Sequence, residues 1–540
     1  MVTFQLLVSL VSFLIVSHFG QANVLPSEEL RDGWIPAGRP HPESTVKIYF
    51  ALKQTGLGWL RDELQAVSDP RSARYGQYSN WDRISHFVHG RRDSVAAFES
   101  ALRSVNFEVQ PWHYTVGRDF AVVDVPVSSA EALFNAQFLT YQSTKKADVR
   151  IVKSKAHSVP ESLRPHLDFV FGISEFPRPN RVFVRHKLPP PFWTIGTTPS
   201  SIDKDYNISG YSSTSSKNSQ AIASFLKQYF SPEDLAKFQE KFNLPNKPIT
   251  KIVGDDKPAN PGIEANLDVQ YISAMGRNVD TWFVYTNKLA NHGQEDFLSW
   301  IIGQVNTTDS PWVHSVSYGD VESSIDTDYL TRVDTEFMKF GVSGRTVLFA
   351  TGDSGVTCSG AGTFTPDWPT SSPHVTAVGG TISLDTVWND GGGGFSNVYT
   401  MPDYQKDTVE AYLKSGQAPP TKYFNVSGRA YPDVSAYAVD FEIVIDGSTT
   451  VVDGTSCATP TFAGILSLLN DVRLLKGKST LGFLNPLLYQ QIKGQGFFDI
   501  QFGNNGAGVC EGFKAVKGWD PASGWGSPNF GLLRYIIDKL

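Results

Sequence analysis

One serine and three carboxylates stand in patterns that suit nucleophilic and acid–base chemistry. Ser456 lies in the sequence Gly-Thr-Ser-Cys-Ala-Thr-Pro at positions 454–460, and a long apolar run follows it. This order predicts a turn that leads into a buried helix, with Ser456 at the helix N-terminus. Exposed amides and the positive end of the helix dipole favour negative charge there, so a backbone N–H could hold the oxyanion of a tetrahedral intermediate. The alternative is a serine that only caps the helix.

A pair of carboxylates precedes the serine in the chain. Glu264 and Asp268 lie in Pro-Gly-Ile-Glu-Ala-Asn-Leu-Asp-Val-Gln-Tyr, positions 261–271, which begins with a helix-start signal. Their spacing places both on one face of the predicted helix. Like charges there repel by a few tenths of a kcal/mol, and we expect one raised pKa and coupled titrations. The alternative is a solvated pair on an exposed face.

The third carboxylate, Asp353, follows an apolar segment in Thr-Gly-Asp-Ser-Gly, positions 351–355. This order predicts an aspartate just beyond a strand, where α/β sheets keep their active sites. If Asp353 keeps its proton, it can donate to an oxyanion, and losing such a donor typically costs roughly 2.7 to 4 kcal/mol of transition-state stabilisation. The alternative is an aspartate that stabilises its own turn.

The usual partner of a serine nucleophile is histidine, but no histidine stands in such a context. His314 and His374 fall in ordinary strand and loop settings. Gly352 to Gly355 resembles the nucleophile region of chymotrypsin-like peptidases, with Ser354 as nucleophile, and also half of a pepsin-like aspartic dyad. Both readings lack their second component in this sequence. A group other than histidine must therefore take the proton from Ser456.

The bulk composition predicts a folded protein of more than one domain. The 540 residues are enough for at least two cores. Hydrophobic residues make up 41% and charged residues 19%, which excludes a largely disordered or fibrous chain. The formal net charge is -7 without a long Lys/Arg run, so we expect no nucleic-acid partner.

The first residues predict a secreted chain. Residues 1–22 hold an apolar run and then small residues, as in a signal peptide; the alternative is a buried N-terminal helix. The run is too short to span a bilayer, and no later stretch resembles a membrane span. We expect the secretory pathway, with the lysosome or the extracellular space as destination. Sequons at Asn207, Asn306 and Asn425 then become candidate N-glycosylation sites.

Three cysteines, Cys358, Cys457 and Cys510, complete the inventory of reactive side chains. In an oxidising compartment this odd number predicts one disulfide and one thiol. The alternative is three buried, reduced cysteines.

These residues must be positioned by the elements around them. Residues 23–177 mix short alternating segments with amphipathic helical ones, which predicts an α+β domain. Residues 178–197 are rich in Arg and Pro and suit an exposed, cleavable linker. From 198 to 540, apolar runs at 280–285, 313–316, 347–350 and 375–378 alternate with helical patterns such as 326–340. This alternation predicts an α/β domain with a doubly wound parallel sheet.

Taken together, the three motifs resemble the sedolisin, or serine-carboxyl peptidase, family. The resemblance extends over nearly all of the chain after residue 195, at 198–200, 317–320, 371–373, 392–397, 428–434, 481–486 and 518–521. It implies a subtilisin-like catalytic domain, in which Glu264 is the general base to Ser456. Asp268 would orient Glu264 and share a proton with it, and Asp353 would complete the oxyanion hole.

The resemblance also implies further sites. Substrate would bind along Ser317, Tyr318, Gly319, Gly392, Gly393 and Gly394. One structural Ca²⁺ would be held by the carboxylates of Asp499 and Asp520 and by backbone oxygens of Ile500, Val516 and Gly518, since hard oxygen ligands suit this ion. Cys510 would pair with Cys358, which leaves Cys457 as the thiol.

The implied activity is release of tripeptides from unblocked peptide N-termini in acid. A carboxylate base near its usual pKa of about 4.3 stays usable where histidine would be protonated. The segment before the linker would be an inhibitory prodomain, removed by self-cleavage near residues 188–198. The alternatives are an acid endopeptidase of the same family and a catalytically silent binding relative.

Overall fold

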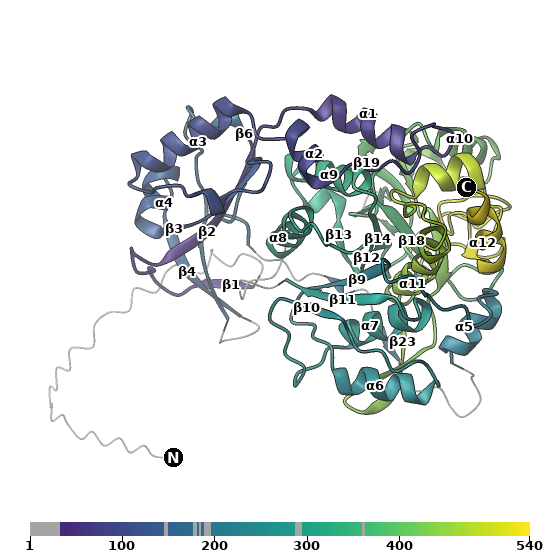
Figure 1. The fold of residues 1–540 in the computed structure, drawn as a ribbon. Helices are drawn as coiled ribbons and strands as arrows, with labels where there is room; N and C mark the ends of the chain where they lie inside the picture. Colours follow the sequence, from purple (N-terminus) through teal and green to yellow (C-terminus); the bar gives the residue numbers. More distant parts are fainter. Residues whose placement is uncertain are drawn as a thin grey trace, which may run out of the picture.

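The computed structural model describes residues 33–144, 149–176, 181–182, 185–187, 196–286, 294–358 and 362–540. The signal peptide predicted at residues 1–22 and most of the linker predicted at residues 178–197 lie outside these ranges. Figure 1 shows a smaller N-terminal domain beside a larger C-terminal domain. In the described part of the chain, no helix is long and apolar enough to cross a membrane.

A seven-stranded sheet forms the centre of the C-terminal domain, in the order β10-β11-β9-β12-β14-β18-β21. All six neighbouring pairs are parallel. The strands are β9 (Ser219–Ser224), β10 (Lys251–Val253), β11 (Asp280–Tyr285), β12 (Val313–Val316), β14 (Thr346–Ala350), β18 (Thr376–Thr381) and β21 (Val434–Tyr437). The sheet agrees with the predicted α/β architecture.

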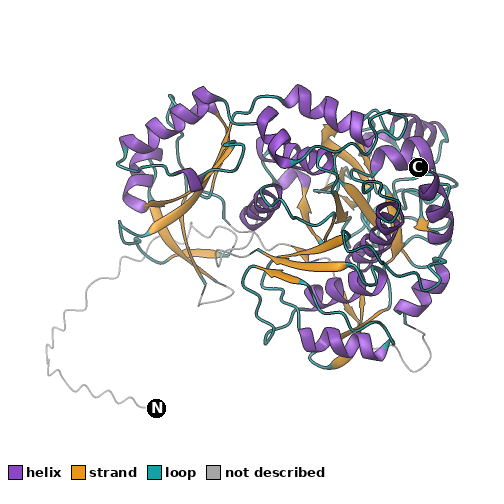
Figure 2. Cartoon of the chain, in the orientation of Figure 1, coloured by secondary structure: helices purple, strands orange, loops and turns teal. Residues whose placement is uncertain are grey.

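Both faces of this sheet are covered by helices (Figures 1 and 2). Alternate residues of one strand enter different cores: Leu348 of β14 packs with α7 and α11, whereas Val347 and Phe349 pack with α8 and α9. This burial on both sides explains why the strands read as continuous apolar runs. The helices are α5 (Pro199–Asp205), α6 (Pro232–Lys241), α7 (Ile263–Met275), α8 (Gln294–Val305), α9 (Thr327–Val342), α10 (Lys406–Lys414), α11 (Thr455–Leu474) and α12 (Phe530–Lys539).

Short strands border the central sheet and complete the C-terminal domain. They are β13 (Tyr318–Val321), β15 (Thr357–Cys358), β16 (Phe364–Thr365), β17 (Asp367–Trp368), β19 (Gly394–Thr400), β20 (Gly428–Tyr431), β22 (Phe441–Ile445), β23 (Ser448–Asp453), β24 (Phe497–Phe498) and β25 (Ser527–Pro528).

The N-terminal domain is an α+β unit, as the mixed pattern predicts. It contains one sheet of order β3-β2-β6 and another of order β1-β4-β5. Its strands are β1 (Trp34–Pro36), β2 (Thr45–Leu52), β3 (Phe120–Pro126), β4 (Phe138–Ser143), β5 (Arg150–Ser154) and β6 (Leu167–Phe171). Its helices are α1 (Leu57–Ser68), α2 (Trp81–Phe87), α3 (Arg92–Ser104) and α4 (Val127–Phe134).

An arm of the N-terminal domain, formed by α1, α2 and their connection, lies across the C-terminal domain (Figure 1). Tyr78 of this arm fills a notch beside two glycines. A Cβ atom at Gly344 or Gly482 would come within 2.4 Å of the Tyr78 side chain, and both glycines have positive φ angles. The Tyr78 hydroxyl donates to the carbonyl of Thr480 at 3.1 Å. Only glycine suits this notch, so the arm fits the surface closely.

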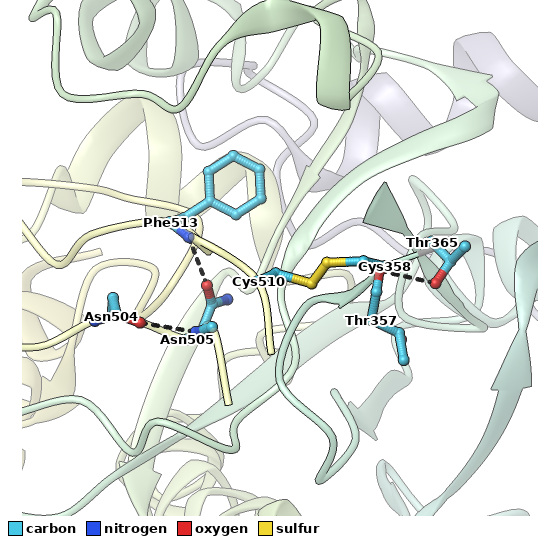
Figure 3. Close-up of a disulfide and its surroundings, with 8 residues drawn as sticks. Thr357, Cys358, Thr365, Asn504, Asn505, Cys510 and Phe513 are labelled. Carbon is cyan, nitrogen blue, oxygen red and sulfur yellow. Dashed lines mark hydrogen bonds between the residues drawn. A yellow bond between two sulfur atoms is a disulfide. The ribbon is translucent and has the colours of Figure 1, made fainter. Parts of the chain in front are cut away.

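A disulfide joins Cys358 and Cys510, with Cα atoms 6.3 Å apart (Figure 3). It connects the loop that follows β14 to the C-terminal loops, across 152 positions of the sequence. Cys457 is a free, buried cysteine. The pairing agrees with the one that the family resemblance implies.

Candidate active site

The four predicted catalytic residues come from two helix starts and one loop beyond the sheet. Glu264 and Asp268 lie in the first turns of α7, Ser456 is the second residue of α11, and Asp353 follows β14. Helices α7 and α11 pack directly on each other. Asp353 lies past the carboxyl end of its strand, as expected for a site in a parallel sheet.

Glu264 and Asp268 form a buried pair rather than a solvated one. Both side chains are 0% exposed. The Ser317 hydroxyl donates to Asp268 Oδ1 at 2.8 Å. Neither oxygen of Glu264 has a hydrogen bond of standard geometry to any described residue. Such burial of two acids costs free energy, which is typical of a functional site.

The surroundings raise the pKa of both carboxyls. Burial, and then the neighbouring Asp268, raise the pKa of Glu264 well above its usual value, while the Ser456 hydroxyl acts in the opposite direction. Burial raises the pKa of Asp268, and the hydrogen bond from Ser317 partly offsets this. The prediction that the base has an ordinary pKa is therefore wrong, because burial keeps both side chains away from water. Because the two carboxyls lie close together, their titrations are coupled and belong to the pair rather than to either group.

Ser456 lies inside α11 rather than at its cap. The cap position is Gly454, so the alternative of a capping serine is wrong. The Ser456 side chain is fully buried, and its hydroxyl lies close enough to Glu264 to lower the pKa of that carboxyl. This hydroxyl forms no aligned hydrogen bond within the described ranges. Such loose geometry is common before substrate binds.

Asp353 is bound to the residue that precedes the candidate nucleophile. Asp353 Oδ1 accepts hydrogen bonds from the backbone N–H and the hydroxyl of Thr455, both at 2.8 Å. The Thr455 hydroxyl also accepts from the N–H of Gly352 at 3.0 Å. Thr455 was not predicted to have a role, although it stands in the motif at 454–460. It ties the third carboxyl to Ser456 across 102 positions of the sequence.

Two short pieces of the predicted linker run beside this site. Backbone strand β7 (Arg181–Val182) pairs antiparallel with β13, opposite Tyr318 and Gly319. Strand β8 (Arg185–Lys187) pairs antiparallel with β23, which leads directly into the turn before Ser456. Both pieces add to existing strands by backbone pairing, which is also how an extended peptide binds to a sheet edge.

Two carboxylates converge on the C-terminal loop predicted to bind calcium. The N–H of Gly518 donates to Asp499 Oδ1 at 3.0 Å, and the N–H of Val516 donates to Asp520 Oδ2 at 2.9 Å. Burial raises the pKa of Asp520 to about 7. A bound cation would stabilise the ionised form of this carboxyl, so the residues present fit a calcium ion with mainly backbone ligands.

Comparison with known proteins decides the family. Residues 32–176 match the family model described as the Pro-kumamolisin activation domain, and residues 287–477 match the Subtilase family. The chain is 40% identical to the Tripeptidyl-peptidase 1 of Macaca fascicularis and to that of Homo sapiens, over 94% of this chain and 94% of each relative. The chain belongs to the tripeptidyl-peptidase 1 family.

The fold of this tripeptidyl-peptidase 1 family member is also that of a solved sedolisin. A Pseudomonas sedolisin, described as a serine-carboxyl proteinase in complex with pseudo-iodotyrostatin, superposes with a TM-score of 0.54 at 24% identity. The match covers 64% of this chain and 99% of the sedolisin. The predicted fold class and the resemblance to the sedolisins are confirmed.

The substrate-binding residues predicted for this tripeptidyl-peptidase 1 family member fall into two groups. Tyr318 and Gly319 lie on β13, which the linker strand pairs, whereas Ser317 contacts Asp268. Gly392 and Gly393 are buried, and a Cβ atom on either would come within 2.0 Å of a backbone oxygen. These two glycines are required by packing, and their contact with substrate, like that of Gly394, stays a prediction.

Ser317→Ala should shift the acid limb of the pH profile. The hydroxyl lowers the pKa of both Asp268 and Glu264, so without it the pair holds its protons to higher pH. We expect the rise of kcat/KM with pH to move to higher pH. Ser315→Ala is the matched control, because Ser315 is a buried residue of β12 with no hydroxyl partner in the described chain. An unmoved limb in Ser317→Ala would contradict the positioning role.

Proposed function

We propose that this protein is an acid-acting serine-carboxyl peptidase that releases tripeptides from unblocked peptide N-termini and is made as a self-activating zymogen. The observation that carries the proposal is the convergence of Ser456 with a buried pair, Glu264 and Asp268. Membership of the tripeptidyl-peptidase 1 family supports the reaction, and the activation-domain match supports the zymogen.

Glu264 takes the Ser456 proton as the hydroxyl attacks the substrate carbonyl. The proton is then available for the leaving amine. Asp268 shares one proton with Glu264, so that the pair carries a single negative charge before attack. Ser317 fixes the Asp268 carboxyl from the other side, at 2.8 Å. Acid suits this base, because a histidine would be protonated there.

Asp353 and the start of α11 stabilise the oxyanion. Thr455 donates twice to Asp353 Oδ1, which fixes this carboxyl next to Ser456 in the chain. In its protonated form the Asp353 carboxyl would donate a hydrogen bond to the intermediate. Backbone N–H groups at the start of α11 also stabilise the negative charge of the oxyanion. In this mechanism the three carboxyls each have a separate role in the reaction of the Ser456 hydroxyl.

The choice between tripeptide release and internal cleavage is tested with one pair of substrates. A reporter peptide with a free N-terminus should lose its first three residues as a tripeptide, whereas the same peptide with an acetylated N-terminus should not be cleaved. Mass spectrometry identifies the products. Equal cleavage of the blocked peptide at internal bonds would support the acid endopeptidase instead.

One calcium ion is part of the proposal, as a structural group. Asp499 and Asp520 would hold it together with the backbone oxygens of Ile500, Val516 and Gly518. The hydrogen bonds that draw both carboxyls onto this loop, and the burial of Asp520, support the site. The ion would stabilise the C-terminal loops and takes no part in the reaction.

Calcium removal should lower the thermal stability. A chelator should reduce the Tm by at least about 2 °C, because a ligand that binds only the folded state stabilises it. Added Ca²⁺ should restore the Tm of the native chain but not that of Asp499→Ala. Asp309→Ala, at an exposed surface pair with Lys251, should respond as the native chain does. A Tm unaffected by the chelator would exclude the site.

The proposed location is the secretory pathway, with the lysosome or the extracellular space as destination. The disulfide supports an oxidising compartment. Asn207 is exposed and accessible to glycosylation. The amide nitrogens of Asn306 and Asn425 donate to backbone carbonyls, at 2.6 and 2.9 Å. We propose N-glycosylation at all three sequons.

A further inference from the structure

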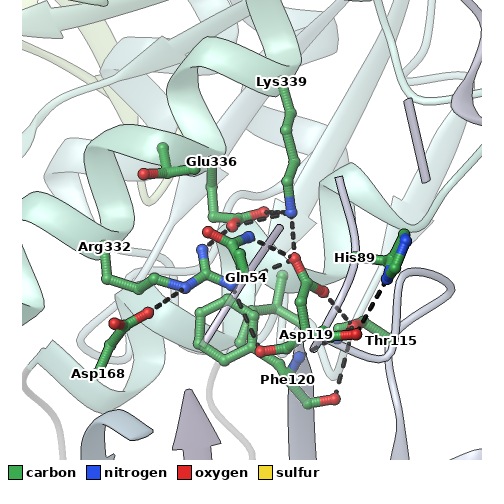
Figure 4. Close-up of polar contacts among 12 residues, drawn as sticks. Gln54, His89, Thr115, Asp119, Phe120, Asp168, Arg332, Glu336 and Lys339 are labelled. Atoms are coloured by element: carbon green, nitrogen blue, oxygen red, sulfur yellow. Dashed lines mark hydrogen bonds and ion pairs between the residues drawn. The ribbon is translucent and has the colours of Figure 1, made fainter. Parts of the chain in front are cut away.

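Beneath the N-terminal domain, helix α9 presents a buried group of three charged side chains (Figure 4). Arg332, Glu336 and Lys339 are 3%, 0% and 6% exposed. Glu336 forms ion pairs with both cations. These three residues therefore carry one uncompensated positive charge toward the interface.

One carboxylate of the N-terminal domain balances this charge. Asp119, which is 2% exposed, forms ion pairs with Lys339 and with Arg332 Nη2, the latter at 3.2 Å. Its other neighbours hold it in place, since Gln54 donates to Oδ2 at 2.7 Å and the Thr115 hydroxyl to Oδ1 at 2.6 Å. Asp119 is thus a fixed anion that enters a cationic site on the other domain.

Further contacts near Asp119 also join helix α9 to the N-terminal domain. The guanidinium of Arg332 stacks over the Phe120 ring at 4.0 Å and reaches Asp168 Oδ2 at 3.4 Å, while Lys53 neutralises Asp168 from within its own domain. All these contacts are made by α9 and the N-terminal domain, and none involves the linker or Ser456. The attachment is therefore independent of the peptide bond that is cut during activation.

We propose that Asp119, held by Arg332 and Lys339, is the anchor that keeps the cleaved N-terminal domain bound to the enzyme as a non-covalent inhibitor in acid. The inference rests on the proposed role of this domain as an inhibitory prodomain. Activation then takes two steps, cleavage of the linker and a separate loss of the anchored domain.

The charges that face Asp119 favour a bond that survives in acid. Burial would raise the pKa of Asp119, but Lys339 and Arg332 outweigh it and hold this pKa below its usual value. The carboxyl therefore stays ionised at the pH at which the enzyme works. The remaining titratable neighbours are Asp168 and Lys53, Glu336, and His89 near Thr115 (Figure 4). Acidification alone should therefore not break this attachment, whereas removal of the charge on Asp119 or on its cationic partners should weaken it.

The test separates docking from activity. The full-length Ser456→Ala chain receives a recognition sequence for a site-specific protease at residues 189–192 and is cut with that protease. Size exclusion at pH of about 4.5 then shows whether the two pieces stay together. We expect co-elution. Separation of the cut but otherwise native pieces would overturn the proposal, and the result does not depend on peptidase activity.

Variants identify the anchor. Asp119→Asn should raise the Kd of the complex at least about 100-fold, because it leaves one buried positive charge of the α9 group uncompensated. Lys339→Gln changes the other domain and should also weaken it, and the double variant should lose less than the sum of both effects. Asp124→Asn, in strand β3 directly after Asp119 but paired with Lys47 at the surface, is the matched control. Equal affinities of Asp119→Asn and Asp124→Asn would overturn the assignment.

Discussion

Ser456→Ala should abolish both peptide release and self-processing. The Ser456 hydroxyl lies beside Glu264 of the buried pair, and in the proposed mechanism it is the nucleophile that forms the acyl-enzyme. We expect kcat to fall at least about 10⁴-fold, as for loss of the nucleophile in other serine peptidases. The full-length chain should accumulate uncut at acid pH, visible on a denaturing gel.

The control for this variant tests the competing nucleophile. Ser354 stands in the chymotrypsin-like sequence Gly-Asp-Ser-Gly, one position after Asp353. Ser354→Ala should retain most of its activity, because the proposed base, Glu264, lies beside Ser456. Retained turnover in Ser456→Ala together with loss in Ser354→Ala would reverse the assignment.

Glu264→Gln should reduce turnover by about 10²–10⁴-fold, the usual contribution of a general base. The amide keeps the shape of the side chain but cannot accept the Ser456 proton. Binding of substrate should change little, so the loss should appear in kcat more than in KM. Glu233→Gln is the control, because Glu233 is an exposed acid in the first turn of α6.

The thermal stability of Glu264→Gln shows whether its loss of turnover comes from the missing base or from a damaged fold. The pKa of Glu264 is raised in the folded state, so its contribution to stability is present below the unfolded pKa of about 4.3 and is lost as pH rises through the folded pKa. Removal of the titrating group should therefore leave the Tm of Glu264→Gln at neutral pH equal to or above that of the native chain. A lower Tm with normal kcat would contradict the assigned role.

The sheet and the carboxylate pair were predictable because their signals are local. Continuous apolar runs marked β11 and β12, since each strand is buried on both faces. The spacing of Glu264 and Asp268 placed them on one helical face, and the Gly-Thr-Ser motif marked the start of α11. Each prediction depended on residues within a few positions of one another.

The contacts that complete the site were not predictable, because they join distant segments. Ser317 meets Asp268 across 49 positions, and Thr455 meets Asp353 across 102. Such pairs depend on which strands lie side by side, which one sequence does not reveal. The charged residues of α9, such as Arg332, have the pattern of a solvated face, but in the structure they are buried and Arg332 pairs with Asp119 of the N-terminal domain.

The central claim is that carboxyl groups, rather than a histidine, carry out the acid–base catalysis in this serine peptidase. The most direct test is the pH dependence of kcat/KM for the processed enzyme on an unblocked tripeptide reporter. We predict a maximum at pH of about 4 to 5, where the pair keeps one proton and Asp353 can donate, and a decline of at least about tenfold by pH of about 7.5. Equal activity at pH of about 7.5 and in acid would contradict the mechanism.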